Sequence, residues 1–214
     1  MKSKESIKNY ASLEEKWNVY THALGLLLST IGLVFLIYKA INEGSLLRLI
    51  SFSVFGVSLI ILYAASALFH NSKDPKRRRQ LNIVDHASIY ILIAGSYTPF
   101  ALITLRGSLG WIIFGIVWGI AFIGIVLKLF YTGRFEKAST IAYVLMGWIV
   151  IIVIKPIINN ISIEGFYWLL GGGVFYTIGA VLYGIQKINY NHAIFHVFVL
   201  GGSICHFITI YFYV

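Results

Sequence analysis

Long apolar runs, separated by short polar segments, make up almost the whole sequence. A helix that crosses a membrane needs roughly 20 predominantly apolar residues, and seven runs have about this length. They cover residues 18–38, 46–69, 83–105, 110–130, 139–157, 164–185 and 193–213. The pattern therefore predicts an all-α integral membrane protein, a bundle of seven transmembrane helices.

Composition agrees with this prediction, and the distribution of charge orients the bundle. Hydrophobic residues make up 58% of the chain and charged residues 12%, whereas soluble proteins are about 45–50% apolar and about 25% charged. With the N-terminus in the cytoplasm, 13 of the 17 lysine and arginine residues lie on the cytoplasmic side, where basic residues concentrate in membrane proteins. We therefore predict a cytoplasmic N-terminus and a C-terminus outside the cell.

The short connections leave no room for a second folded domain. We expect a cytoplasmic N-terminal segment, residues 1–17, followed by a single transmembrane domain, residues 18–214. The N-terminal segment is polar and lacks the apolar core of a signal peptide, so we expect the first helix to stay in the membrane.

The most basic stretch of the chain is KDPKRRRQ, residues 73–80. In a soluble protein such a run would favour a nucleic-acid interface, but here it connects the second and third predicted helices. We interpret residues 73–79 as an anchor at anionic lipid headgroups on the cytoplasmic side. Accordingly, we predict no nucleic-acid partner.

Ionisable side chains within the predicted helices form a small group. A charged residue at the centre of a transmembrane helix costs about 2.5–3.5 kcal/mol, so such residues mark candidate functional sites. Ser66 and His70 are four residues apart at the end of the second helix, as are His192 and His196 at the start of the seventh. Asp85 begins the third helix. In the predicted topology all five residues lie in the cytoplasmic leaflet.

Three imidazoles and a nearby carboxylate are typical of a zinc site. Catalytic zinc commonly has three protein ligands and keeps a fourth position for water. We predict that His70, His192 and His196 bind Zn²⁺. Asp85 would act as a base or hydrogen-bond to the metal-bound water, and Ser66, one turn from His70, would help to hold that water.

Two further histidines fit the zinc site less well. His206 is ten residues beyond His196, which is about 15 Å along a helix, so we expect a polar contact between helices instead. His86 neighbours Asp85 but points about 100° away around the helix. We therefore predict that neither is a ligand.

The first helix carries the sixth histidine, His22. It shares a helix face with Glu15 and Asn18, because the three residues are spaced at i, i+3 and i+7. Two interpretations stay open at this point. The group either supports the metal ligands or ties the first helix to the bundle.

Taken together, these motifs resemble the hemolysin III family, the bacterial branch of the progestin and adipoQ receptor superfamily. The resemblance covers nearly the whole chain and includes EEKWNVYTHALG, SALFH, VDHASIYILIAGSYTPF and HAIFHVFVLGGSICHF. It implies a seven-helix bundle with a cytoplasmic N-terminus and a zinc ion near the cytoplasmic leaflet. The family's three histidine ligands correspond to His70, His192 and His196, and its serine and aspartate near the metal correspond to Ser66 and Asp85.

The resemblance also implies lipid chemistry at a bacterial cell membrane. Eukaryotic relatives and the similar alkaline ceramidases are linked to hydrolysis of lipid amide bonds. We therefore expect a zinc-dependent hydrolase of a lipid amide or ester bond, with a membrane lipid as substrate. Two alternatives stay open: a non-enzymatic membrane-homeostasis or receptor-like protein with structural zinc, and a cytolytic protein of the hemolysin type.

Overall fold

Helices make up most of residues 10–214, the part of the chain that the structure, a computed structural model, describes. Their bounds are α1 (Ser12–Asn42), α2 (Leu46–Asn71), α3 (Pro75–Pro99), the π-helix η1 (Phe100–Leu105), α4 (Gly107–Tyr131), α5 (Glu136–Gly147), the 3-10 helix η2 (Trp148–Val153), α6 (Ile154–Asn160), α7 (Ile163–Gly184) and α8 (Asn191–Tyr213). Within the described residues, seven helical segments are long and apolar enough to cross a membrane. The prediction of an all-α protein with seven spans is confirmed.

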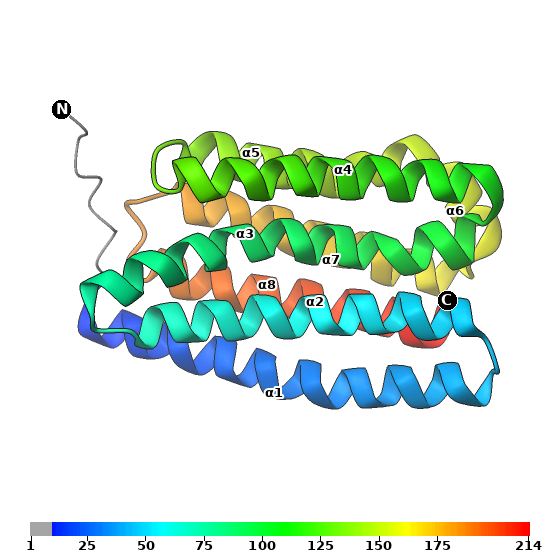
Figure 1. Cartoon of the computed structure of the whole chain (residues 1–214), viewed down its shortest axis with the longest axis horizontal. Helices are drawn as coiled ribbons and strands as arrows, with labels where there is room; N and C mark the ends of the chain where they lie inside the picture. The colour runs from blue at the N-terminus through cyan, green and yellow to red at the C-terminus, as the bar shows by residue number, and fades with distance from the viewer. Residues whose placement is uncertain (1–9) are drawn as a thin grey trace.

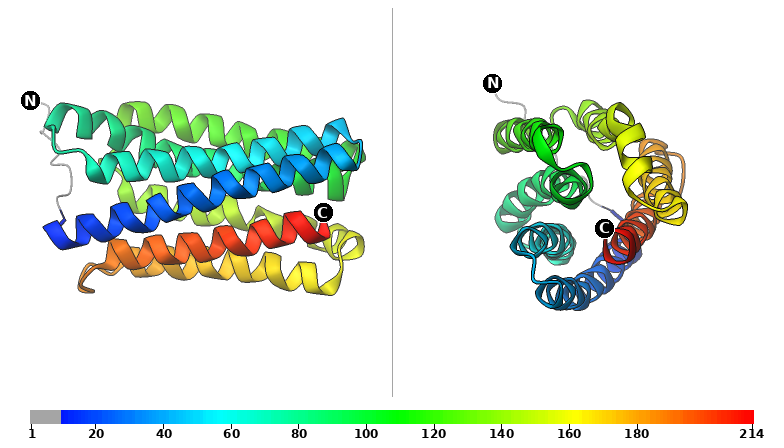
Figure 2. Two further views of the ribbon diagram at one scale, coloured as in Figure 1. Left: turned by 90° about the horizontal axis from the view of Figure 1, so that it is seen from below. Right: turned by 90° about the vertical axis from the view of Figure 1, so that its right-hand side faces the viewer.

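The spans run side by side along one direction and alternate in sense (Figure 1). Seen from the end, they form a ring that α1 closes by packing against both α2 and α8 (Figure 2). Because of the alternation, the end of α2 and the starts of α3 and α8 lie at the same end of the bundle. This is the relative placement that the sequence analysis requires; the side of the membrane on which this end lies stays a prediction.

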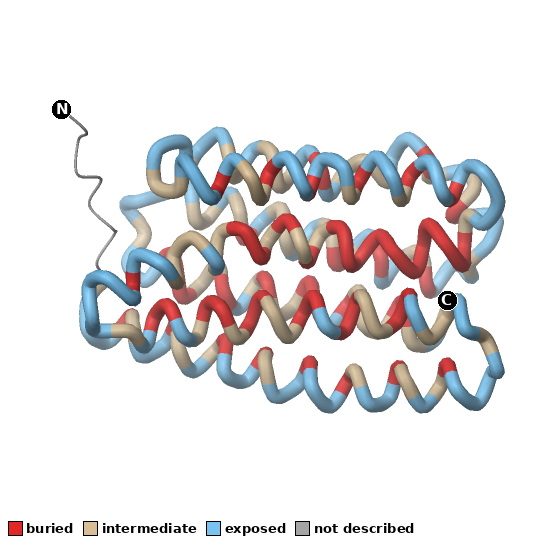
Figure 3. Tube along the Cα trace, in the orientation of Figure 1, coloured by how far each residue is buried: buried red, intermediate tan, exposed pale blue. Residues whose placement is uncertain are grey.

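Buried residues follow the inward faces of the helices, and α3 is the most extensively buried span (Figure 3). The buried stripe of α1 repeats every three or four residues, the period of one helix face. Its members are Glu14, Asn18, His22, Gly25, Ser29, Gly32, Leu36 and Ala40. The outward faces carry large exposed apolar side chains, as expected where lipid replaces water around the protein.

The connection between α2 and α3 is shorter than the basic run suggested. Only residues 72–74 separate the two helices, because Pro75 begins α3 and the Asp74 side chain accepts a hydrogen bond from the backbone N–H of Arg77 at 2.7 Å. Proline in the first turn and aspartate at the N-cap are both favourable at this position. Most of residues 73–79 therefore belong to the first turns of α3.

The fifth span changes helical type partway, where α5 ends and η2 begins. The Tyr97 hydroxyl of α3 donates a hydrogen bond to the carbonyl oxygen of Gly147 at 2.6 Å and accepts one from the N–H of Val150 at 2.8 Å. A side chain that inserts into the backbone hydrogen-bond ladder is a recognised cause of helix distortion. The interruption therefore originates in a neighbouring helix.

Gly110 of α4 marks a close approach of two backbones. A Cβ atom at Gly110 would lie 2.1 Å from the carbonyl oxygen of Ala101, whereas one at Gly119 on the same helix would meet no atom within 4 Å. Since a backbone carbonyl cannot move aside cheaply, we expect Gly110→Ala to lower the free energy of unfolding by about 1–3 kcal/mol. Thermal unfolding in detergent measures this effect. Gly119→Ala is the matched control, and an equal change in both variants would contradict the prediction.

Candidate metal centre

Two helix termini hold the three histidines that the sequence analysis selected as ligands. His70 lies in the last turn of α2, and His192 and His196 lie one turn apart at the start of α8. The start of α8 is fixed by Asn191, whose side-chain amide donates a hydrogen bond to the carbonyl oxygen of Tyr183 at 3.0 Å. All three histidine side chains are buried.

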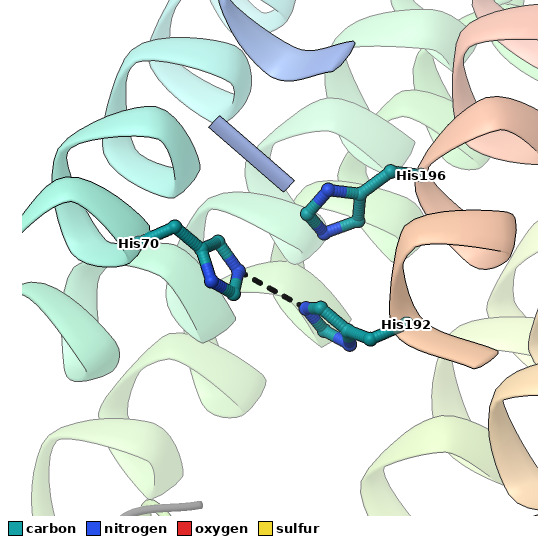
Figure 4. A group of neighbouring side chains, drawn as sticks. All are labelled: His70, His192 and His196. Carbon is teal, nitrogen blue, oxygen red and sulfur yellow. Dashed lines mark hydrogen bonds between the residues drawn. The ribbon is translucent and has the colours of Figure 1, made fainter. Parts of the chain in front are cut away.

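The three imidazoles point towards one another across the gap between α2 and α8 (Figure 4). One nitrogen from each of His70, His192 and His196 lies within 4.8 Å of the other two. The Nε2 atoms of His70 and His192 are 3.0 Å apart. Zn–N bonds of about 2.0–2.1 Å in a tetrahedral site separate two ligand nitrogens by about 3.3 Å. The three nitrogens could therefore hold a metal ion, and the His70–His192 pair is spaced almost as two zinc ligands would be.

Asp85 and Ser66 lie beside the histidine triad, the group formed by His70, His192 and His196. The buried Ser66 hydroxyl hydrogen-bonds to the half-buried Asp85 carboxyl group, which also interacts electrostatically with His70. Asp85, Ser66, His192 and His196 line the same cavity. The structure thus brings together all five residues that the sequence analysis placed at the site.

One face of α1 contacts the outward nitrogens of the triad. The Nδ1 atom of His70 is 2.6 Å from Oε2 of Glu15 and 3.3 Å from Nδ2 of Asn18. The Nδ1 atom of His196 is 3.4 Å from the hydroxyl of Thr21. Support of the ligands, one of the two interpretations of this helix face, therefore agrees with the contacts of Glu15 and Asn18. Thr21 was not selected from the sequence, although it lies one turn after Asn18.

His22 contacts the triad differently from its neighbours on α1. Its ring stacks on that of His196, with centroids 3.5 Å apart, and meets the ring of Tyr63 edge-on at 5.1 Å. Both ring nitrogens are buried and have no hydrogen-bond partner among the described residues. His22 therefore packs against His196 and also ties α1 to α2.

Arg78 lies in a different environment from the one predicted for it. The sequence analysis placed it with residues 73–79 at the lipid headgroups. It is buried, while the other basic residues of the run, Lys73, Lys76, Arg77 and Arg79, are exposed. Its guanidinium group forms an ion pair with Glu15, donates to the carbonyl oxygens of Phe69 and Ser72 at 3.3 Å, and lies over the Phe69 ring. Nothing in the run KRRR distinguishes this arginine, because its partner precedes it by 63 residues.

Tyr10, just before α1, covers the triad and was also missed. Its ring stacks on His192, with centroids 4.5 Å apart, and its side chain hydrogen-bonds to that of Tyr183. Burial is the largest cause that raises the pKa of the Tyr10 phenol, so the phenol stays neutral. The tyrosine lies in the polar N-terminal segment, where no helical periodicity singles it out.

The remaining two histidines lie apart from the triad. His206 packs edge-on against the Tyr176 ring at 5.3 Å, which is a contact between α8 and α7. His86 lies near Lys128 of α4, and its carbonyl oxygen accepts a hydrogen bond from the Tyr143 hydroxyl at 3.0 Å. In the described part of the chain, the group that fits a metal ion contains neither residue.

A cavity of about 330 Å³ leads away from the triad into the bundle. Its lining begins near the triad, with polar residues that include Asp85 and His192, and reaches Leu105 and Ile157 near the opposite end. Most of the lining side chains between these ends are apolar or aromatic. The cavity therefore offers a polar end at the histidine triad and a long apolar compartment, a combination that suits an amphiphile.

Comparison with known proteins gives matches over most of the chain. The profile of a family described as Haemolysin-III related matches residues 10–207. "Hemolysin-3" of Bacillus cereus is 47% identical over 201 residues, which cover 94% of this chain and 92% of the relative. "Hemolysin-3 homolog" of Bacillus subtilis (strain 168) is 47% identical over 200 residues, or 94% of each chain.

A more distant match is eukaryotic. "Monocyte to macrophage differentiation factor" of Homo sapiens is 27% identical over 214 aligned residues, which cover 94% of this chain and 84% of the relative. The similarity thus spans most of both proteins.

Proposed function

The chain belongs to the Haemolysin-III related family, and from this premise we propose that it is a zinc-dependent hydrolase of a lipid amide or ester bond. The family assignment confirms the predicted resemblance, and the human relative supports the wider superfamily. The relatives from two Bacillus species and the seven candidate spans identify a multi-pass bacterial membrane protein. The proposal concerns its chemistry.

The observation that carries the proposal is a histidine triad at the polar end of a mostly apolar cavity. A purely structural metal needs no cavity beside it, whereas a hydrolase needs room for its substrate. An acyl chain in the apolar compartment would place a polar linkage near the triad. The substrate class is therefore an amphiphilic membrane lipid with an amide or ester bond close to its headgroup.

Each residue near the triad has a distinct role in this proposal. His70, His192 and His196 hold the zinc ion, which activates a water molecule and polarises the carbonyl group when it is bound. Asp85 accepts a proton from the attacking water and returns it to the leaving amine or alcohol. The Ser66 hydroxyl, hydrogen-bonded to Asp85, keeps the carboxyl group oriented.

The exposed basic residues at the start of α3 supply a second contact with lipid. Lys73, Lys76, Arg77 and Arg79 lie at the same end of the bundle as the triad. We propose that these four side chains face anionic headgroups, to which each juxtamembrane cation contributes about 1 kcal/mol. Arg78 is not part of this surface, because it is buried against Glu15.

A second candidate function is supported by the position of the ligands. The triad joins α2 to α8, which are not consecutive in the chain. A zinc ion there would link these helices even if it performed no chemistry, as structural zinc sites do. In this case the protein would be a non-enzymatic membrane-homeostasis or receptor-like protein.

Removal of the metal tests the proposed hydrolase directly. We expect the purified zinc-loaded protein to release fatty acid from at least one member of a panel of amide- and ester-linked lipids, and a chelator to abolish this release. Re-addition of zinc should restore it, since the three histidines remain in place. Mass spectrometry of the lipid products provides the measurement. No release from any member of a broad panel by zinc-loaded protein would contradict the proposal.

A further inference from the structure

A short hydrogen bond between Glu15 and His70 constrains the ring of His70. Oε2 of Glu15 lies 2.6 Å from Nδ1 of His70, and the His70 side chain is fully buried. A carboxylate can only accept a hydrogen bond, so Nδ1 of His70 is the donor. The Nε2 atom then carries the free lone pair, and this is the atom that faces His192 at 3.0 Å.

Arg78 fixes the carboxylate in this position. Its guanidinium group forms an ion pair with Oε1 of Glu15, while the other carboxylate oxygen faces His70. The same guanidinium donates to the carbonyl oxygens of Phe69 and Ser72, which flank His70 in the chain. Arg78 therefore holds both Glu15 and the terminal turn of α2 that carries the histidine.

We propose that Glu15, held by Arg78, is a positioning residue of the metal centre: it fixes the tautomer and ring orientation of His70 so that Nε2 binds the metal. The inference rests on the metal site described under the proposed function and adds a role for α1. A carboxylate that accepts from the outer nitrogen of a histidine ligand raises the basicity of that ligand and orients it. The N-terminal turns of α1 are thus part of the metal centre although they supply no ligand.

A pair of substitutions separates positioning from a merely structural ion pair. Glu15→Gln loses the charge but keeps one acceptor oxygen, which can face His70 while the amide nitrogen faces Arg78. Glu15→Met loses both acceptors at similar volume. We expect Glu15→Met to weaken zinc binding about 10–100-fold, and Glu15→Gln to retain most of the wild-type affinity. If Glu15 served only as the partner of Arg78, both variants would lose affinity equally.

Competition with a chromogenic chelator measures zinc affinity, and this readout does not depend on hydrolysis. Glu14→Met is the matched control. Glu14 is the adjacent buried acidic residue, and its Oε1 atom has no hydrogen-bond partner among the described residues. Arg78→Met should weaken zinc binding more in the wild-type background than in Glu15→Met, where only its hydrogen bonds to Phe69 and Ser72 remain to be lost. An additive loss in the double variant would overturn the role assigned to Arg78.

A spectroscopic measurement on the unsubstituted protein covers the case in which Glu15→Met does not fold. Solid-state NMR of the metal-free chain with ¹⁵N-labelled histidine should show His70 as the Nδ1–H tautomer, with its signals assigned by their loss in His70→Gln. An Nε2–H tautomer would overturn the proposal, as would wild-type zinc affinity in folded Glu15→Met. The latter result would leave the metal site itself intact, whereas wild-type protein that binds no zinc would overturn both.

Discussion

Replacing His192 with alanine is expected to reduce bound zinc from about one ion per chain to almost none, because two histidines cannot replace the three protein ligands of such a site. His192 contributes an Nε2 atom only 3.0 Å from that of His70, and its ring is held by stacking against Tyr10. Metal analysis of protein purified with limiting zinc gives the stoichiometry. Since metal binding stabilises only the folded state, the melting temperature of the zinc-loaded sample should fall as well.

His206→Ala is the matched control for this experiment. It removes a histidine from the same helix, α8, but from a position that contacts Tyr176 and not the triad. We expect this variant to keep its zinc. Equal zinc content in His192→Ala and the wild type would contradict the assigned site, and so would an equal loss in His206→Ala.

Much of the fold could be predicted from the sequence because the membrane imposes a simple rule on it. Lipid satisfies no backbone hydrogen bonds, so each apolar run of sufficient length has to form a helix. The same rule made the relative position of the site predictable. Since consecutive spans alternate, a histidine at the end of α2 and two at the start of α8 necessarily lie at the same end.

Features that depend on tertiary contacts were not predictable in this way. The change from α5 to η2 requires the hydroxyl of Tyr97, which belongs to another span. In the same way, Arg78 differs from its basic neighbours only because Glu15 of α1 lies opposite it. Sequence spacing showed that Glu15 and Asn18 share a face, but only the folded bundle shows that this face meets His70.

The two roles proposed for zinc, structural and catalytic, make different predictions for Asp85. In a structural site the carboxyl group only packs near the ligands, so the isosteric change Asp85→Asn should have little effect on function. In a hydrolase the carboxyl group moves a proton at each turnover, and an amide cannot do so. Asp85 lines the cavity that would receive substrate, where it hydrogen-bonds to Ser66, and it also interacts with His70. This position favours the second case.

We therefore expect Asp85→Asn to keep its zinc and its melting temperature but to lower the rate of lipid hydrolysis by about 10²–10⁴-fold. Asp74→Asn is the matched control, because it is the other aspartate of the chain and caps α3, a role in which asparagine serves equally well. The measurement is the turnover rate on the lipid that gives the fastest release in the panel. A wild-type rate in Asp85→Asn, together with loss of activity in His192→Ala, would remove Asp85 from the proton transfer and require another base. Retention of zinc in an inactive Asp85→Asn variant would instead separate proton transfer from metal binding, because it would show that the three histidines hold the ion without the help of Asp85.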